Sequence, residues 1–562
     1  MPENLPTRHG GQLVVDALRN NGVDTVFCLP GESFLGILDT LLDTPEIKLV
    51  TCRHEAGAAF MAEAYGKLTG KPAVCLVTRG PGACNASIGV HNAKHDSTPM
   101  LVLIGHATRY EVQREAFQEI EYRHMYLELT KWVAQIDTVD RIPEFVSRAF
   151  NLATSGRQGP VALVMPEDML DDKIAMPDAP PAITVQPEPS ENQMTAFRAL
   201  LEKAKRPFLI SGSVLSEQAV NDLTAFAEAN RIPATVGFRR QDCFDMTSPC
   251  YAGDIGYGPI PADLADRVKE SDLIVAVGSR LNTIITQDFT LFDRLGDNQE
   301  LVHVHPASEE IGRLYTPVLG IQAGTAEFAA AARAMAPVES DHRMKWVEDA
   351  HGAYLETLTP PPCDGPLDPG QAMLQLQEWL PDDAIVTIDA GAYSSWPLRF
   401  LRFKRPMRLL AGNLGAMGSS VPAGVAAAIT CPDRQVVSML GDGSALMTGQ
   451  EIATAMQNEA KPIVILFNNG IYGTIRLNQE NHYPGRVSGT DLVNPDFAAW
   501  ARSFGAHGEA VERTEDFLPA LERAKASGTA ALIELRIDED LVSSRTTLSA
   551  ARDKALAAQD AD

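Results

Sequence analysis

Short apolar runs recur along this chain and alternate with longer stretches in which apolar residues return at helical spacing. Residues 436–440 and 463–467 are nearly continuous apolar runs, which is typical of strands buried on both faces of a parallel sheet. Residues 11–20 and 55–68 instead show the spacing of amphipathic helices. Strands that alternate with helices indicate parallel sheets covered by helices, an α/β fold.

The predicted strands fall into three groups, and prolines cluster between the groups at 177–189 and 360–369. We therefore expect three doubly wound parallel-sheet domains at residues 1–180, 190–340 and 365–540, followed by a tail at 541–562. The alanine-rich, charged tail leaves two alternatives open, a helix that covers a site or a disordered end. The expected strands are 25–27, 48–51, 74–78, 100–104, 161–165, 208–211, 273–277, 302–304, 385–388, 436–440, 463–467 and 531–535.

The chain of 562 residues carries 73 acidic and 48 basic side chains, a net charge of −25. This balance argues against binding to nucleic acid or to an anionic membrane, because both need a basic surface. The eight cysteines form no Cys-x-x-Cys motif and several stand inside apolar runs, so we expect buried, reduced thiols. No segment has the apolar length of a signal peptide or a membrane span, and we expect a cytoplasmic protein.

A glycine-flanked aspartate, Asp442, ends one of the apolar runs, and Asn469 follows the next run. Neighbouring parallel strands end on the same edge of their sheet, where ligands collect. A carboxylate, an amide oxygen and phosphate oxygens are hard ligands that suit Mg²⁺. Gly443 would let the backbone approach a phosphate, and Ser444 would begin a helix whose N-terminus favours an anion. A lone Gly-Asp-Gly is more often a simple turn, but the paired asparagines at this distance favour a ligand site.

The helix expected between these two strands covers residues 446–458. Its exposed face includes Glu451, and its apolar positions are Leu446, Ile452, Ala453 and Met456. The segment is thus a predicted strand–helix–strand unit with candidate ligands at its two ends.

Two segments, 441–444 and 467–470, resemble the signature Gly-Asp-Gly…Asn-Asn of the thiamin diphosphate enzymes. The three predicted domains with their proline-rich linkers are similar to the pyrimidine-binding, central and diphosphate-binding domains of that family, so the resemblance covers nearly the whole chain. It implies that thiamin diphosphate and Mg²⁺ are the cofactors. In the family, the aspartate, the second asparagine and a main-chain oxygen two residues later bind the metal, which corresponds to Asp442, Asn469 and Ile471.

Glu55 follows a short apolar strand and begins a helix of small residues. The resemblance implies that its carboxyl shares a proton with N1′ of the coenzyme's aminopyrimidine, which makes Glu55 a candidate catalytic residue. Taken alone, Glu55 is more simply explained as an acid that favours a helix N-terminus. Its presence in one chain with the metal motif favours the catalytic role.

Residues 413–418 resemble the family loop that bends the coenzyme. Met417 would be the apolar wedge, and main-chain atoms of Gly415 and Met417 would hold the pyrimidine. The simpler alternative is a glycine-rich turn with a core methionine. Residues 389–393 are loosely similar to a second diphosphate loop, and the further coenzyme contacts that the resemblance implies are Gly391, Ala392, Tyr393, Gly443, Ser444, Gly473 and Thr474.

Segments 29–31, 96–99 and 116–119 resemble acetohydroxyacid (acetolactate) synthases and related carboligases. The resemblance implies decarboxylation of a 2-oxo acid and joining of the remaining carbon unit to a second carbonyl compound, a 2-oxo acid or an aldehyde. Gln118 would be a catalytic residue that orients the acceptor. Arg79 stands where the synthases have a small residue, and it either binds a substrate carboxylate or forms an ion pair. The candidate substrate residues are Gly31, Arg79, Phe117 and Gln118.

The central segment departs from the synthases, because residues 279–284 are Ser-Arg-Leu-Asn-Thr-Ile where the synthases carry Arg-Phe-Asp-Asp-Arg. A simple 2-oxo acid decarboxylase, an aldehyde lyase and a 2-hydroxyacyl-CoA lyase therefore stay open as alternatives. A non-catalytic binding or regulatory subunit is disfavoured, since the metal ligands and Glu55 are retained. The sequence does not identify the donor or the acceptor.

Gly212 and the segments 278–280 and 304–306 are vaguely similar to the FAD site of the synthases, where FAD has no redox role. FAD therefore stays open as a third cofactor. Glu55 and the metal motif stand in different domains, and in the family these halves meet across a subunit interface. The resemblance thus implies a homodimer as the minimal active unit, and we expect a homotetramer.

Overall fold

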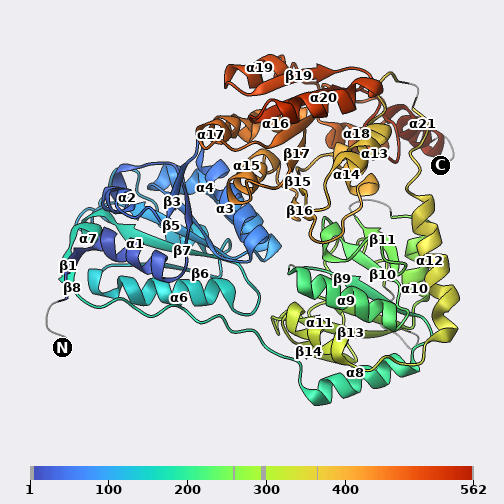
Figure 1. Ribbon diagram of the computed structural model, residues 1–562, viewed down its shortest axis with the longest axis horizontal. Coiled ribbons are helices and arrows are strands. Elements are labelled where there is room, and N and C mark those ends of the chain that lie inside the picture. The colour runs from blue at the N-terminus through green and yellow to red at the C-terminus, as the bar shows by residue number, and fades with distance from the viewer. Residues whose placement is uncertain (1–4, 215, 257–259, 293–298, 364, 560–562) are drawn as a thin grey trace.

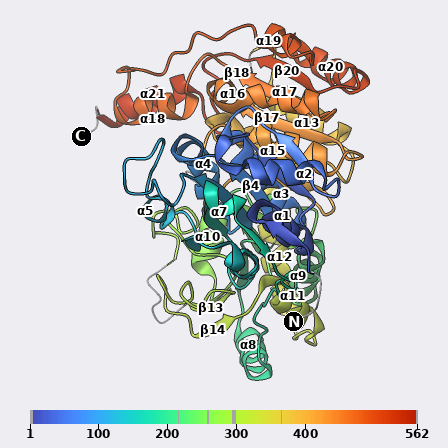
Figure 2. The ribbon, with the colours of Figure 1, turned by 90° about the vertical axis from the view of Figure 1, so that its left-hand side faces the viewer.

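The computed structural model describes residues 5–214, 216–256, 260–292, 299–363 and 365–559. The chain forms three α/β units, each built on a six-stranded parallel sheet, which confirms the predicted fold class (Figure 1). The first unit lies on the left of Figure 1, the central unit at the lower right and the third unit above them. Figure 2 shows the molecule with the first unit facing the viewer.

The first unit begins near the N-terminus. Its strands are β1 (Thr7–His9), β2 (Thr25–Cys28), β3 (Lys48–Thr51), β4 (Ala73–Val77), β5 (Met100–His106), β6 (Trp132–Gln135), β7 (Pro160–Pro166) and β8 (Lys173–Ala175). Its helices are α1 (Gly10–Asn20), α2 (Leu35–Leu42), α3 (Glu55–Thr69), α4 (Gly80–Asp96), α5 (Tyr122–Tyr126), α6 (Ile142–Thr154) and α7 (Glu167–Asp171). The sheet order is β3-β2-β4-β5-β7-β6, and β1 pairs with β8 in a separate antiparallel ladder.

The central unit has a different strand order. Its strands are β9 (Pro207–Ser211), β10 (Ala234–Gly237), β11 (Tyr251–Ile255), β12 (Leu273–Val277), β13 (Glu300–His305) and β14 (Leu319–Gln322). Its helices are α8 (Glu191–Lys203), α9 (Glu217–Ala229), α10 (Ala262–Glu270), α11 (Thr325–Ala334) and α12 (Met344–Glu356). The sheet order is β11-β10-β9-β12-β13-β14.

The third unit repeats the strand order of the first. Its strands are β15 (Ile385–Ile388), β16 (Arg408–Ala411), β17 (Val436–Gly441), β18 (Ile463–Asn468), β19 (His507–Val511) and β20 (Ala531–Arg536), in the order β16-β15-β17-β18-β20-β19. Its helices are α13 (Pro369–Trp379), α14 (Ser395–Phe400), α15 (Ser420–Thr430), α16 (Asp442–Thr448), α17 (Ile452–Gln457), α18 (Gly473–His482), α19 (Phe497–Ser503), α20 (Thr514–Ala526) and α21 (Leu548–Gln559).

Each sheet contains a point where the chain reverses its direction of winding. This point lies between β2 and β4, between β9 and β12, and between β15 and β17. Open α/β sheets bind ligands at the carboxyl ends of the strands beside such a point. The topology therefore provides one candidate crevice in each unit.

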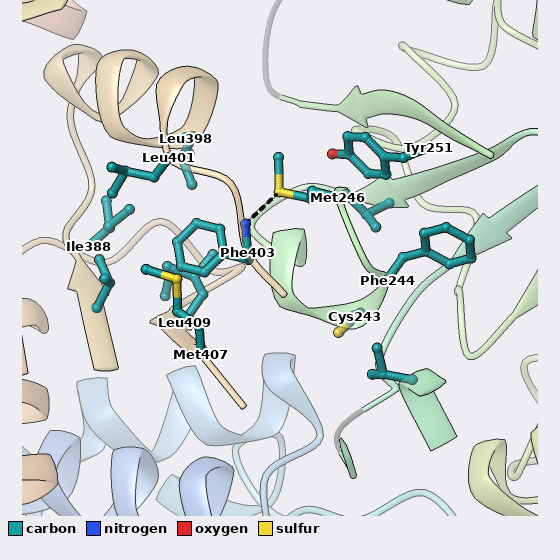
Figure 3. Close-up of a cluster of buried hydrophobic side chains, with 14 of the residues drawn as sticks. Cys243, Phe244, Met246, Tyr251, Ile388, Leu398, Leu401, Phe403, Met407 and Leu409 are labelled. Atoms are coloured by element: carbon teal, nitrogen blue, oxygen red, sulfur yellow. Dashed lines mark hydrogen bonds between the residues drawn. The ribbon is translucent and has the colours of Figure 1, made fainter. Parts of the chain in front are cut away.

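The third unit shares a hydrophobic core with each of the other two. Toward the first unit, α15 packs on α3, and Val425 and Leu466 belong to the same buried cluster as Phe27 and Val50. Toward the central unit, Phe403 lies beside Met246, whose sulfur accepts the Phe403 N–H at 3.2 Å (Figure 3). The three units are therefore packed together, and the loops at their strand ends hold fixed positions.

Every strand expected from an apolar run is present in the structure. Most strands that the pattern missed lie at sheet edges: β6, β11, β14, β16 and β19. The pattern also missed the inner strand β10 and the separate β1–β8 pair. An edge strand is covered on fewer sides, and β6, for example, is only half-buried. Its sequence therefore lacks the continuous apolar run that marks a central strand.

The prediction of one helix at 446–458 is wrong in two respects, its continuity and the face that it buries. It is broken by a 3-10 turn, Gly449–Glu451, that separates α16 from α17. Glu451, expected on the exposed face, is fully buried because its carboxylate accepts the N–H groups of Arg53 and His54, each at 3.0 Å. Leu446, expected on the apolar face, is 56% exposed. A helical pattern within one segment does not reveal that another domain covers it.

The tail forms a helix, the first of the two alternatives. Helix α21 packs on α18, and the Arg552 guanidinium binds the buried carboxylate of Glu480. Leu548 packs against Ile471, so the tail lies against a candidate metal-binding residue. Within the described residues, no helix combines the length and the apolar character needed to cross a membrane.

The cysteines follow the expectation of buried thiols only in part. Five are buried, whereas Cys363 and Cys431 are partly exposed and Cys84 is exposed on α4. The buried ones are Cys28, Cys52, Cys75, Cys243 and Cys250. Burial raises the pKa of Cys28, a thiol in a central strand, to about 12, which keeps that thiol protonated and unreactive.

Candidate coenzyme and metal site

Asp442 lies where β17 ends and α16 begins, and three donors hold its carboxylate. Oδ1 accepts the Gly443 N–H at 2.9 Å, and Oδ2 accepts the Gly470 N–H and the Asn494 amide, each at 2.8 Å. The side chain is buried, and burial raises the pKa of this carboxyl above its ordinary value. A cation beside Asp442 would therefore offset the cost of a buried negative charge.

Asn468 ends β18 and Asn469 follows it, and the two asparagines have different surroundings. Asn468 donates to Glu534 at 2.7 Å and accepts from Asn494 at 3.0 Å, which ties it to the sheet. Asn469 is half-buried, and its side chain makes no hydrogen bond within the described part of the chain. Its amide oxygen is therefore available to a ligand, as the sequence predicts for this position.

Ile471 stands in the loop that leads from β18 to α18. The loop is fixed by hydrogen bonds from the Tyr472 N–H to Thr490 at 2.9 Å and from the Leu492 N–H to Gly470 at 2.8 Å. Because β17 and β18 are paired neighbours, Asp442, Asn469 and Ile471 lie at one edge of the third sheet. No group of three His, Cys, Asp or Glu side chains that could hold a metal occurs among the described residues. A metal here would thus take one carboxylate and neutral oxygens, a donor set that suits Mg²⁺.

The start of α16 offers a hydrogen-bond donor to an anion. Gly441 precedes the helix and offers no side-chain cap, while the Ser444 hydroxyl is buried without a hydrogen-bond partner in the described structure. A Cβ on Gly443 would lie 2.6 Å from the Tyr472 ring, so only glycine fits between that ring and the helix. These features fit a phosphate group bound at the helix N-terminus.

The segment after β15 places its main chain, rather than its tyrosine side chain, toward the crevice. Gly391 has a φ of +152°, which favours glycine, and Ala392 follows it. The Tyr393 hydroxyl donates to the main-chain oxygens of Asp389 at 3.0 Å and Met439 at 2.8 Å. The Tyr393 side chain therefore joins two strand ends and is not available as a ligand.

The start of α18 is the remaining part of the predicted phosphate cradle. Gly473 is its first residue, and a Cβ there would lie 2.8 Å from Val542 of the tail. Thr474 follows and is half-buried. The tail thus packs directly against the end of the candidate metal loop.

The loop that carries Met417 follows β16. Gly415 has a φ of +73° and is exposed, and Met417 is half-buried. Asp389 fixes the end of the loop, because its carboxylate accepts the Gly418 N–H at 2.8 Å and the Ala390 N–H at 2.7 Å. Burial raises the pKa of Asp389 to about 6.

Glu55 is buried at the start of α3, on the edge of the first sheet. Its Oε2 accepts the Asn85 amide at 2.9 Å, and the main chain just before it is held by Glu451 of the third unit. No hydrogen bond or ion pair in the described part of the chain joins Glu55 to Asp442 or Asn469. Within one chain, the predicted metal ligands follow the paired strands β17 and β18, whereas Glu55 follows β3 in the sheet of the first unit.

Arg79 is engaged inside the first unit. Its guanidinium forms an ion pair with Glu167 and lies 3.9 Å from Glu32. Its Nε is buried without a partner in the described structure. This geometry matches the ion-pair alternative, although one nitrogen remains unused.

The other substrate candidates lie around the same strand ends. A Cβ on Gly31 would lie 2.4 Å from the Thr78 side chain, so glycine is required there. The Gln118 main-chain oxygen accepts the Gly80 N–H at 2.9 Å, whereas Phe117 is 72% exposed. Gln118 is thus attached to the loop that carries Arg79.

A cavity of about 530 Å³ borders the central unit at its switch point, between β9 and β12. A Cβ on Gly212 would lie 2.4 Å from the Gly278 main-chain oxygen, so the two strand-end loops touch. Cationic and polar groups line the cavity, among them Arg157, Ser213, Arg280, His305, Thr325 and Arg434. The segments that resemble an FAD site in the sequence thus border a real cavity.

A CoA ester would need a cationic groove in the central unit, and the adjacent Arg239 and Arg240 of this unit are both buried. Arg239 donates to the main-chain oxygens of Gly412 and Asp389, each at 3.0 Å. Neither guanidinium faces solvent, so the structure offers no support for a CoA site there.

Sequence reasoning singled out neither Asn494 nor Asn85, and it placed Asp389 in a candidate loop without giving its carboxylate a role. Asn494 reaches Asp442 from 52 positions further along the chain, on a loop with no motif of its own. Asp389 had a usable signal, since it directly follows an apolar strand at the switch point. Asn85 lies on α4, and nothing in its spacing from Glu55 marks it as a partner.

Comparison with known proteins gives matches along nearly the whole chain. Three family models match: thiamine pyrophosphate enzyme, N-terminal TPP binding domain at residues 8–125, central domain at 194–332, and C-terminal TPP binding domain at 389–535. The acetolactate synthase large subunit of Parasynechococcus marenigrum is 33% identical over 95% of this chain and 88% of its own length. The acetolactate synthase isozyme 2 large subunit of Escherichia coli is 32% identical over 94% of this chain and 96% of its own length.

Proposed function

The chain belongs to the thiamine pyrophosphate (thiamin diphosphate) enzymes of the acetolactate synthase type, and from this premise we propose that it decarboxylates a 2-oxo acid and joins the remaining carbon unit to a second carbonyl compound. The observation that carries the proposal is the edge of the third sheet, where Asp442, Asn469 and Ile471 meet. The buried Glu55 of the first unit supports the same chemistry.

Mg²⁺ would be held by the Asp442 carboxylate, the Asn469 amide oxygen and the Ile471 main-chain oxygen. The diphosphate would bind at the start of α16, at Gly443 and Ser444, with Gly473, Thr474 and the main chain of Gly391, Ala392 and Tyr393 around it. When bound, thiamin diphosphate supplies a nucleophilic carbon and accepts the electrons released as carbon dioxide leaves. Met417 and Gly415 would position the aminopyrimidine, and Glu55 would hold a proton at its N1′ atom.

Substrate selection would take place at the strand ends of the first unit. Gln118 would orient the acceptor, and Gly31 and Phe117 would line its path. Arg79 would attract a substrate carboxylate through its guanidinium charge, with Glu167 holding the guanidinium in place. An Arg79→Ala variant whose KM is unchanged for every accepted anionic substrate would remove Arg79 from this role.

A homodimer would be the minimal active unit, and a homotetramer the expected form. Exposed apolar side chains border both halves of the site: Ile88 near Asn85 in the first unit, and Leu446, Met447, Ile475 and Val493 in the third. Apolar patches of this kind mark interaction surfaces. A second copy would cover them and bring its Glu55 to the metal loop.

FAD in a non-redox role would occupy the cavity at the central switch point. The strand order of this sheet is the order that binds dinucleotides, and Arg157, Arg280 and Arg434 provide cations for a diphosphate. Calorimetric titration with FAD tests this part separately, because absence of FAD binding would not contradict the proposed reaction.

Proton NMR of the products from pyruvate with thiamin diphosphate and Mg²⁺, with and without a second carbonyl compound, tests the reaction. A 2-hydroxy ketone or acetolactate supports carboligation. Acetaldehyde alone would make the enzyme a simple decarboxylase. Absence of turnover with bound coenzyme would exclude pyruvate as donor and favour a larger 2-oxo acid or an aldehyde.

A further inference from the structure

The loop at 412–419, which carries Met417, is fixed at both ends by buried carboxylates. At its end, Asp389 accepts the Gly418 N–H at 2.8 Å. At its start, Asp96 of the first unit accepts the Asn413 N–H at 2.8 Å. The exposed Gly415 lies between these anchors. The two carboxylates therefore hold the main chain on both sides of Met417.

Asp96 belongs to a buried cluster of four charged side chains. Lys67 Nζ lies 2.5 Å from Asp96 and 2.8 Å from Glu63, and Arg240 lies 3.2 Å from Asp96. Two cations thus face two carboxylates, and the charges balance. Burial opposes ionisation of Asp96, but Lys67 and Arg240 outweigh it and lower its pKa to about 2. Asp96 is therefore an ionised hydrogen-bond acceptor at neutral pH.

The same cations hold the carbonyl groups where β16 enters the loop. Lys67 donates to the Ala411 oxygen at 3.1 Å, and Arg240 donates to the same oxygen at 3.3 Å. Arg239 donates to the Gly412 oxygen at 3.0 Å. Lys67 comes from the first unit and both arginines from the central unit, whereas the loop belongs to the third. All three units therefore converge on the start of the loop.

We propose that Asp96 is a positioning residue for the reaction, because it sets the place of Met417 through the main chain of Asn413. The inference rests on the proposed role of Met417 and adds to it a residue that touches neither coenzyme nor substrate. Its effect is expected on turnover more than on coenzyme affinity, since the metal and diphosphate residues are anchored elsewhere in the third unit.

Asp242 provides a matched control at the other end of β16. It is also buried, it faces Arg405 and Arg408 at 3.4 and 3.0 Å, and it accepts a main-chain N–H, that of Leu409, at 3.2 Å. It holds the start of the strand rather than the loop. Asp96→Asn and Asp242→Asn therefore remove the same charge from similar surroundings.

The experiment compares hydrogen exchange of the 412–419 peptide, kcat, and the coenzyme Kd in the two variants. We expect Asp96→Asn to speed exchange of this peptide and to lower kcat by about 10–100-fold, with the coenzyme Kd changed by less than about threefold. Asp242→Asn should leave the exchange of the peptide and kcat near the wild-type values. Equal effects of both variants, or unchanged exchange in Asp96→Asn, would overturn the proposal.

Two further variants test the proposal when Asp96→Asn does not fold and separate it from the proposed role of Met417. If Asp96→Asn does not fold, Asp96→Glu keeps the charge but moves the carboxylate by one methylene, and wild-type exchange with wild-type kcat would then overturn the proposal. Met417→Ala separates the inference from its premise. If Met417→Ala keeps full activity while Asp96→Asn still loosens the loop and lowers kcat, Asp96 acts through the loop but the proposed role of Met417 fails.

Discussion

The first and third units have the same strand order but different chemistry at the ends of their strands. In the first unit, the edge strand β3 leads to Glu55, whose neighbours are Asn85 and small residues. In the third unit, the inner strands β17 and β18 lead to Asp442 and Asn469. One sheet design thus presents a single buried acid in one unit and a set of candidate oxygen ligands in the other.

The fold determines where a site forms, and the residues of the loops determine what the site binds. Asp442 follows β17, which borders the switch point of the third sheet, whereas Glu55 follows the edge strand β3, one strand away from the switch point of the first. The loops differ in the glycines, acids and amides that follow each strand. Each of the two parts of the proposed coenzyme site can therefore be tested by its own substitution.

The largest effect is expected in the first unit, from Glu55→Gln. If Glu55 holds a proton at the pyrimidine, kcat should fall by about 10²–10⁴-fold, because proton transfer contributes about that much. Coenzyme binding, measured by calorimetry, should persist. Glu459→Gln, on an exposed side chain of the third unit, is the control. A Glu55→Gln enzyme with normal kcat would remove Glu55 from the mechanism.

In the third unit, Asp442→Asn is expected to weaken coenzyme binding, which Glu55→Gln should leave intact. Loss of the carboxylate should weaken binding of thiamin diphosphate in the presence of Mg²⁺ by at least about 100-fold, because a metal site depends on its charged ligand. The test is calorimetric titration of apoenzyme with and without Mg²⁺. Affinity that equals that of the wild type would contradict the assignment of the metal site.

Asp389, the acid that anchors the end of the Met417 loop, gives a pH-dependent prediction. Its folded pKa of about 6 lies above the ordinary value of 3.8, so its ionisation destabilises the folded state as the pH rises from about 4 through 6. Asp389→Asn lacks this penalty. Relative to the wild type, the variant should therefore gain about 2–3 kcal/mol of unfolding free energy between pH 4 and pH 7. Urea denaturation at both pH values measures the change, and a constant difference would refute it.

The smallest effect is expected from Arg79→Ala, at the other side of the first unit's crevice. Loss of the guanidinium should raise KM for an anionic donor about tenfold, or about 1.4 kcal/mol, with little change in kcat. Arg79→Lys should recover only part of this loss, because lysine lacks the planar fork. Steady-state kinetics with a charged donor and a neutral aldehyde separates a substrate role from a structural one.

The sequence predicted the parts of the fold that rest on local pattern. Central strands such as β17 and β18 are apolar along their whole length, and their ends carried the Asp442 and Asn469 signals. Edge strands such as β19 contain polar residues and were missed. The fold class was predictable because alternation of strands and helices is a property of the chain alone.

Contacts between distant segments could not be predicted. Glu451 was placed on an exposed helix face, yet it binds the main chain before Glu55 in another unit. Asn494 completes the surroundings of Asp442 from a loop with no pattern of its own. Both contacts arise from tertiary packing, which the periodicity of a single segment does not reveal.

In the proposed homodimer, Glu55 of one copy and the candidate metal loop of the other serve a single coenzyme. Mixing the Glu55→Gln and Asp442→Asn variants, after dissociation and reassembly, tests it directly. Mixed dimers would contain one site with both changes and one with neither, so about a quarter of the wild-type activity should return in a random mixture. If both variants are inactive alone and the mixture stays inactive although mixed dimers form, the two halves do not meet between copies and the claim is contradicted.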